Sequence, residues 1–268
     1  MFGRRADAKL IRGQSRMRRF MPFISPRRNE SLFYYAQEVE ADAALRFIED
    51  VNRDRPDDAQ MTLFHLVLRA AALAMHSQPS VNRFVAGGRI WQRSEVWITF
   101  SAKQEIVDGA PLLTVKRRFE EGESLDEMVD DILAGLRSRR GGKKTRSDRE
   151  VGAALTLPAF VIRAGIWLLH KANMLGLLPK SMIDDDPLFA SLFVANLGSV
   201  GMEAGYHHLW EYGTCSIFTV LGRIQERWDG KRVFEMKYSY DERMADGLAG
   251  GIGMERIRES LKNPEKLR

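Results

Sequence analysis

Apolar and polar positions repeat with two different periods along the chain, and the pattern predicts both strands and helices. Residues 31–41 are rich in aromatic side chains and valine, which is typical of a strand. Residues 42–54 then place apolar positions at helical spacing, and Asp42 is available as the N-cap. Residues 61–80 are apolar almost all round, which predicts a helix inside the core.

Further segments add a hairpin, several strands and two helices. The hairpin turns at Gly87 and Gly88, and Ser124 followed by Glu127 forms a capping box before a helix over 125–139. The remaining predicted strands are 95–103, 111–117, 192–198, 215–224 and 233–240, and a final helix covers roughly 246–262. No internal repeat is visible. The pattern therefore predicts an α+β fold with a mostly mixed or antiparallel sheet.

One apolar stretch, residues 155–178, approaches the length that crosses a membrane. It contains the charged residues Arg163 and Lys171 and is interrupted by Pro158 and Gly176. A charge at the centre of a bilayer costs several kcal/mol, which argues against a spanning helix. We expect a pair of buried or amphipathic helices, with interfacial membrane contact as the alternative.

Positive charge is concentrated in two segments of this 268-residue chain, which has 41 basic and 36 acidic residues. Residues 4–28 carry nine basic side chains against Asp7, and residues 137–149 carry seven against Asp148. A solvated arm and a mobile loop are the simplest interpretations. A phosphate-bearing ligand, an anionic membrane surface and an acidic partner remain open. No zinc-ligand or helix-turn-helix pattern accompanies either segment, which argues against nucleic acid.

Cys215 is the only cysteine, so the chain cannot form an internal disulfide, and a reducing compartment is expected. Cys215 precedes a run of β-forming residues, which predicts a buried, unreactive thiol on a core or interface strand. The first residues lack the apolar core of a signal peptide. We therefore expect a cytoplasmic protein, with peripheral association at the membrane as a further possibility.

Six short segments, taken in order, resemble one known family. They are Met17-Arg18-Arg19, the helix after Met61-Thr62, the hairpin and strand over 79–102, VANLGSVG at 194–201, VLGRI at 220–224 and DERMADG at 241–247. Over about 16–135 and 187–262 the chain resembles the catalytic domain of the dihydrolipoyl acyltransferases of 2-oxoacid dehydrogenase complexes. The resemblance implies a two-layer sandwich like that of chloramphenicol acetyltransferase, with a mostly mixed sheet covered by helices.

The resemblance also implies roles for four positions. The family motif reads Asp-His-Arg-x-x-Asp-Gly, and its histidine is the general base that deprotonates an incoming thiol or hydroxyl. A serine or threonine donates a hydrogen bond to the oxyanion, and the motif aspartate pairs with an N-terminal arginine. These roles fall on Glu242, Ala195, Asp246 and Arg18. The base and the hydroxyl are therefore replaced, whereas the pair of Arg18 and Asp246, which we expect to be buried, is kept.

Glu242 is poorly matched to the role of that histidine. A thiol titrates about four pH units above an ordinary glutamate, which corresponds to roughly 5–6 kcal/mol. Loss of an oxyanion donor typically costs about 2.7–4 kcal/mol more. Arg243 would hold the carboxylate of Glu242 ionised if its guanidinium turned toward it. We interpret Glu242 as an ionised carboxylate that fills the position of the base without performing its reaction.

His207 and His208 are candidates for a relocated base. Glu211 lies four residues after His207, so a helical backbone would place the two on one face. Ordinary polar loop or interface residues are the alternative interpretation. A metal site is disfavoured, because adjacent histidines point apart on a regular backbone and no third ligand is suitably spaced.

These observations lead to one predicted organisation and three hypotheses for function. We expect a basic arm over 1–15 and a single domain over 16–268, with an insertion at about 137–187. The first hypothesis is an acyltransferase that takes an acyl group from a thioester such as acyl coenzyme A to an unknown acceptor. It needs no permanently bound cofactor and is expected to be a homotrimer. The second is a catalytically inactive, ligand-binding or scaffolding homologue, and the third is a membrane-surface protein.

Overall fold

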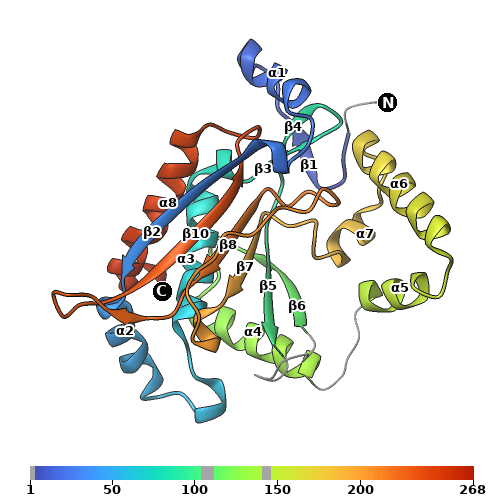
Figure 1. The fold of residues 1–268 in the computed structure, drawn as a ribbon. Coiled ribbons are helices and arrows are strands. Elements are labelled where there is room, and N and C mark those ends of the chain that lie inside the picture. The colour runs from blue at the N-terminus through green and yellow to red at the C-terminus, as the bar shows by residue number, and fades with distance from the viewer. Residues whose placement is uncertain (1–3, 104–111, 141–145) are drawn as a thin grey trace.

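The larger of two sheets forms the centre of the fold in the computed structural model, which describes residues 4–103, 112–140 and 146–268 (Figure 1). Its strand order is β2-β10-β8-β7-β5-β6, and a short strand, β9, pairs with β10. The strands are β2 (Leu32–Glu40), β5 (Val96–Lys103), β6 (Leu112–Phe119), β7 (Leu192–Asn196), β8 (Ile217–Leu221), β9 (Gln225–Glu226) and β10 (Arg232–Asp241). Among the strands of the described residues, only the β5–β7 and β7–β8 pairs are parallel, so the sheet is mixed, as predicted.

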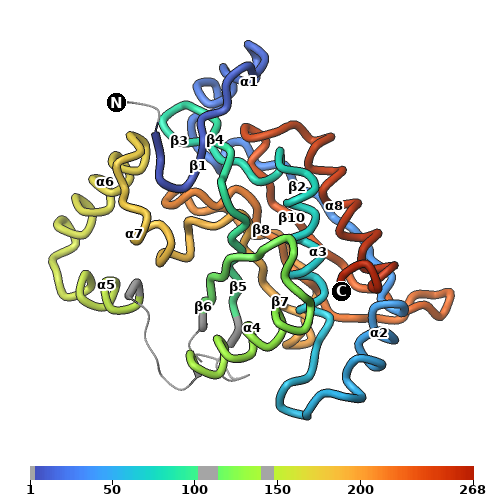
Figure 2. The backbone as a smooth tube through the Cα atoms, turned by 180° about the vertical axis from the view of Figure 1, so that it is seen from behind, coloured from blue at the N-terminus to red at the C-terminus, as the bar shows by residue number. Residues whose placement is uncertain are grey.

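Four helices cover one face of this sheet. They are α2 (Asp42–Asn52), α3 (Leu63–Ser77), α4 (Leu125–Arg140) and α8 (Gly247–Lys262). The view from behind shows α3 and α8 in front of the sheet (Figure 2). Buried apolar side chains from both layers form the main core there, including Leu66, Phe100, Phe234 and Leu261. The predicted two-layer α+β sandwich is therefore confirmed.

A second, smaller sheet and four more helices surround this sandwich. Strand β4 (Arg89–Arg93) lies between β1 (Ala8–Leu10) and β3 (Arg83–Ala86), and both pairings are antiparallel. The helices are α1 (Arg16–Ile24), α5 (Arg146–Ala154), α6 (Ala159–Leu175) and α7 (Lys180–Asp185). Helices α5 and α6 stand away from the large sheet (Figures 1 and 2).

Local capping decides where the core helices begin. Helix α3 follows Thr62, whose backbone N–H donates to Nδ1 of His65 at 3.0 Å, closing a capping box. Ser124 and Glu127 form the predicted box before α4, with their side chains 2.9 Å apart. The predicted N-cap of α2 was wrong, because Asp42 lies inside the first turn and accepts from Nε of Arg232 at 2.7 Å.

The N-terminal segment is not the solvated arm that its charge suggested. Residues 8–10 pair with β4, and the Arg5 guanidinium is buried. Nε of Arg5 lies 2.8 Å from Oδ1 of Asp7, and its Nη2 donates to Oδ1 of Asn173 at 2.9 Å. Arg5 thus ties the start of the chain to the C-terminal end of α6.

The apolar stretch 155–178 contains one long helix, α6, where a pair of buried or amphipathic helices was expected. Most of its large apolar side chains are exposed, and Asn173 is the single buried residue of α6. The expectation of burial failed because α6 lies beyond the edge of the sheet. None of the helices in the described part of the chain is long and apolar enough to cross a membrane.

The basic segment 137–149 is only partly described. Residues 137–140 end α4 and residues 146–149 begin α5, whereas 141–145 lie outside the described residues. The predicted mobility of this loop therefore stays a prediction.

The imidazole of His65 should make stability depend on pH. Burial lowers the pKa of His65 from 6.5 to about 4, so the unfolded chain binds a proton at a higher pH than the folded chain does. The stabilisation that comes from the neutral His65 ring is fully present above pH ~6.5. The free energy of unfolding should fall by about 3 kcal/mol as the pH drops toward ~4. In His65→Gln, glutamine keeps the capping box, and this part of the pH dependence should disappear. Urea unfolding across this pH range is the measurement, and an unchanged slope would contradict the assignment.

Cys215 should react slowly with thiol reagents. It is buried just before β8, and its Sγ–H donates to the carbonyl of Ile217 at 3.2 Å. Burial raises the pKa of the thiol, which reduces the reactive thiolate. Labelling of the native protein should match the rate of global unfolding, and rapid labelling under native conditions would show that the thiol is accessible.

Candidate functional site

The segment 241–247 forms the turn that joins the end of β10 to the start of α8. Asp246 is the N-cap of α8 and accepts from the backbone N–H of Ala249 at 2.9 Å. The turn divides its charged residues into two groups. Asp241 and Arg243 are buried, whereas Glu242 and Asp246 are exposed.

The buried group is a charge cluster centred on Asp241. Nε and Nη2 of Arg243 donate to its two carboxylate oxygens at 2.9 and 2.8 Å, and Nε of Arg28 lies 3.8 Å away. Nη1 of Arg243 donates to the carbonyls of Ser25 and Pro26. Arg243 therefore faces Asp241, and the possibility that it holds Glu242 ionised was wrong.

Arg28 extends this cluster into a loop on the other side. Its guanidinium donates to the carbonyls of Trp210 and Gly213. Burial lowers the pKa of Arg28, and the charge of Asp241 opposes that shift. The cluster thus joins three segments that are far apart in sequence: the residues after α1, the loop before β8 and the end of β10.

The exposed group contains the predicted pair of Arg18 and Asp246. Nη2 of Arg18 lies 4.0 Å from Oδ2 of Asp246, whose side chain is 64% exposed. Nη1 of Arg18 donates to the backbone carbonyl of Glu242 at 2.6 Å. The pair exists within one chain, but it is not buried as expected, so it should contribute at most about 1 kcal/mol. Arg18 holds the backbone of Glu242 and leaves its carboxylate free in solvent.

Ala195 and Glu242 lie far apart within one chain. Ala195 on β7 is the register partner of Val220 on β8, and Val220 is opposite Lys237 on β10. Asp241 lies four residues after Lys237, which is roughly 14 Å along β10. Strands β7 and β10 are two strand spacings apart, which adds about 10 Å between Ala195 and the end of β10. A single chain therefore cannot bring these two positions to one reacting group.

Ser101 on β5 is a hydroxyl that the sequence analysis missed. It is the register partner of Ala195 in the parallel β5–β7 pair. Phe100 and Val194 face the main core, so the alternation of side chains places Ser101 and Ala195 together on the opposite face. Neighbouring strands are about 4.8 Å apart, so a hydroxyl lies beside the position where the family carries one. Only the strand pairing reveals this relationship.

His207 lies over that same face of the sheet. The loop over 202–216 crosses it, and the apolar cluster beneath the loop includes Phe193, Phe218 and Ala195. The His207 ring stacks on Phe218, with centroids 4.0 Å apart, and on His208, with centroids 4.4 Å apart. The two histidines do not point apart as expected, because the loop backbone is irregular.

A hydrogen bond fixes the tautomer of His207. Its Nδ1 lies 2.7 Å from the carbonyl oxygen of His208, so Nδ1 carries the proton and donates. Nε2 therefore keeps its lone pair, which a general base needs. Partial burial lowers the pKa of His207, which favours the neutral ring near pH 7. His208 is exposed and supplies only the orienting carbonyl.

Glu211 does not orient either histidine, contrary to the sequence-based expectation. Its carboxylate accepts from the backbone N–H groups of Arg28 and Asn29, both at 3.0 Å, and from Nδ2 of Asn29 at 2.9 Å. The segment over 205–213 is not helical, so Glu211 is not on a common helical face with His207. In the described residues no group of three or more His, Cys, Asp or Glu could hold a metal ion.

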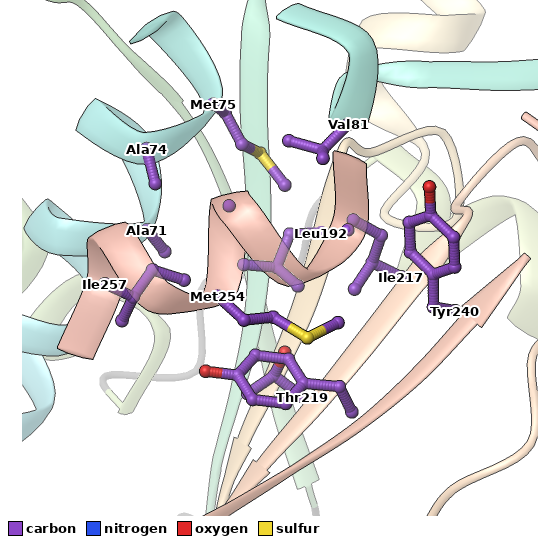
Figure 3. A pocket seen from close by; sticks show the side chains of 13 residues that line it. Ala71, Ala74, Met75, Val81, Leu192, Ile217, Thr219, Tyr240, Met254 and Ile257 are labelled. Atoms are coloured by element: carbon purple, nitrogen blue, oxygen red, sulfur yellow. The ribbon is translucent and has the colours of Figure 1, made fainter. Parts of the chain in front are cut away.

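A small cavity lies on the opposite, helix-covered face of the sheet (Figure 3). Its volume is about 30 Å³, and its lining is mostly apolar, with side chains from α3, α8, β8 and β10. The buried hydroxyl of Thr219, in this lining, has no hydrogen-bond partner among the described residues. The cavity has room for about one water molecule and is too small for coenzyme A.

Comparison with known proteins assigns this architecture to a class. A probable dihydrolipoamide acetyltransferase from Listeria monocytogenes superposes with a TM-score of 0.61 at 16% identity, covering 94% of each chain. The truncated catalytic core of the 2-oxoacid dehydrogenase complex from Thermoplasma acidophilum gives 0.62 at 13% identity, covering 95% of this chain and 98% of that one. Chloramphenicol acetyltransferase gives 0.56 at 13% identity, covering 95% and 100%.

No protein-family model and no curated protein matches the chain by sequence. The chain therefore has the fold of the dihydrolipoamide acetyltransferase cores and of chloramphenicol acetyltransferase, as the sequence analysis predicted, and is a divergent example of it. At this level of identity the similarity shows the fold alone.

The two groups of charges in the turn should respond differently to loss of charge. Asp241→Asn should lower the free energy of unfolding by about 3–5 kcal/mol, because it leaves two buried guanidinium groups without their counterion. Glu242→Gln removes the same charge from the adjacent exposed position and should change stability by less than ~0.5 kcal/mol. Urea unfolding of both variants compares them directly. Equal losses would mean that the cluster around Asp241 does not organise the turn.

Proposed function

We propose that this chain transfers an acyl group from a thioester donor to a thiol or hydroxyl acceptor, with His207 as the general base. The observation that carries the proposal is the 2.7 Å contact between Nδ1 of His207 and the carbonyl of His208, because it leaves the Nε2 lone pair free. The acyltransferase-like fold supports the reaction class. Acyl coenzyme A is the donor that we favour, as a co-substrate and not a bound cofactor.

The proposed reaction uses protein groups that lie on one face of the sheet. Nε2 of His207 takes the proton of the acceptor S–H or O–H, and the acceptor attacks the thioester carbonyl carbon. We assign to Ser101 the hydrogen bond to the resulting oxyanion, which Ala195 cannot donate. The tetrahedral intermediate then collapses, the C–S bond breaks, and the leaving thiolate takes the proton from Nε2.

We further propose that the active form is a homotrimer. The positions of Ala195 and Glu242 are too far apart within one chain to meet at one reacting group, so a site that uses both positions has to form between two copies. The edge strand β2 carries the half-exposed aromatic residues Phe33, Tyr34 and Tyr35, which suit contact with another copy. In this proposal Glu242 takes part in the site through its backbone carbonyl, which Arg18 holds, and it does not abstract a proton.

His207→Asn should lower the rate of acyl transfer from acetyl coenzyme A to a dithiol by about 10²–10⁴-fold, because it removes the base. His208→Asn keeps the orienting carbonyl and, like Glu242→Gln, should retain most of the activity. Ser101→Ala should lower the rate about 10²–10³-fold. Since burial lowers the pKa of His207, the acid limb of the pH–rate profile should lie below the ordinary value of about 6.5.

An inactive ligand-binding or scaffolding homologue is the second candidate. The exposure of the Glu242 carboxylate and the methyl group at position 195 favour it, because neither can perform the family reaction. If the wild-type protein is inactive and only the double variant Ala195→Ser, Glu242→His transfers acyl groups, this second candidate is correct. Loss of activity in Glu242→Gln, with His207→Asn fully active, would refute the relocated base.

A further inference from the structure

Helix α1 is short, basic and apolar at the same time. Its nine residues include three arginines, and no acidic residue occurs anywhere between positions 8 and 29. Its large apolar side chains point into solvent, and Phe20 is 58% and Phe23 66% exposed. A basic amphipathic helix with exposed phenylalanines is typical of contact with an anionic membrane surface.

A cationic groove lies directly beside this helix. Its volume is about 600 Å³, and it is lined by segments of β1, α1 and β4 and by the turn that joins β1 to α1. Arg12, Arg16, Arg19 and Arg89 line it, and within the described residues none of them has an ion-pair partner and no acidic side chain shares the lining. Phe20 and Phe23 form its apolar wall. The groove thus combines four free cations with an apolar surface, which matches the phosphate and the upper acyl chain of an anionic lipid.

The turn between β3 and β4 contacts both α1 and a second apolar helix, α6, at the same end of the molecule. A Cβ on Gly88 would lie 3.0 Å from the Phe23 ring, and one on Gly87 would lie 2.4 Å from the Met174 carbonyl of α6. The two glycines, both with positive φ, therefore let the turn sit between α1 and α6. In both views strands β1, β3 and β4 lie between these helices (Figures 1 and 2).

Helix α6, like α1, combines exposed apolar side chains with basic residues. Phe160 is 74% and Trp167 61% exposed, and the helix carries Arg163 and Lys171 among its apolar residues. Residues 151–183 contain no acidic residue. Arg5 fixes its C-terminal end through Asn173, so α6 is anchored to the body of the protein while its N-terminal part projects.

We propose that α1 and α6 form a docking surface for an anionic lipid bilayer, with lipid phosphates in the groove of Arg12, Arg16, Arg19 and Arg89. The aromatic side chains of both helices enter the boundary between headgroups and acyl chains, and the arginines contact the headgroups. This inference is independent of the acyl-transfer proposal. The absence of acidic residues from both segments favours a negatively charged bilayer over a second, similarly charged copy of the chain.

Sedimentation of the full chain with vesicles tests the surface. Binding should be strong to phosphatidylcholine vesicles that contain phosphatidylglycerol, weak to phosphatidylcholine alone, and should decrease as salt is added. Arg16→Gln, Arg19→Gln should weaken partitioning about 25-fold, since each cation near the surface contributes about fivefold. Phe20→Ser, Trp167→Ser should weaken it by more than about tenfold.

Matched controls come from another part of the surface. Arg256→Gln, Lys266→Gln removes the same charge from a groove whose lining includes Glu121 and Glu259. Trp228→Ser, Leu248→Ser removes two large apolar side chains that are 93% and 75% exposed. Both control variants should bind vesicles as the wild type does.

Three results would overturn the docking surface. The first is equal binding to neutral and anionic vesicles, or no binding to either. The second is an equal loss of binding in the control variants. The third is a change in oligomeric state for Phe20→Ser, Trp167→Ser without any vesicle binding by the wild type, because it would make these helices an interface between copies of the chain.

Discussion

The ion pairs of the buried Asp241 carboxylate are the interaction on which the site depends. Asp241 ends strand β10, between β2 and β8, and neutralises Arg243 directly and Arg28 at longer range. These guanidinium groups donate to backbone carbonyls in the segment after α1 and in the loop before β8. Because a buried charge without its partner is costly, the turn, the N-terminal segment and the loop that carries His207 must keep one arrangement.

The same cluster explains how the scaffold can persist while the chemistry changes. Asp241 and Arg243 are buried in the architecture, whereas Glu242 between them faces solvent and is free to vary. Substitution of the base therefore need not disturb the turn. The loop fixed by Arg28 carries a histidine with a defined tautomer over the same face of the sheet to which Ala195 and Ser101 belong.

The sequence by itself determined the secondary structure of the sandwich and the identity of the fold. Helix α3, the capping box at Ser124 and the turn at Gly87-Gly88 follow from local rules, because capping and backbone preferences involve residues close together in the chain. The six ordered segments were enough to indicate the fold, and the replacements at 195 and 242 could be read directly. Burial of Cys215 was also predictable from its β-forming surroundings.

Only the tertiary structure decided which side chains share a face and which are exposed. The register of β5 and β7 places Ser101 beside Ala195, 94 positions later in the chain, and no local pattern contains that pairing. The exposure of α6 and the use of Glu211 as a cap likewise depend on neighbours distant in sequence. Periodicity shows that a helix has an apolar face, but whether that face meets a core or solvent depends on where the rest of the chain lies.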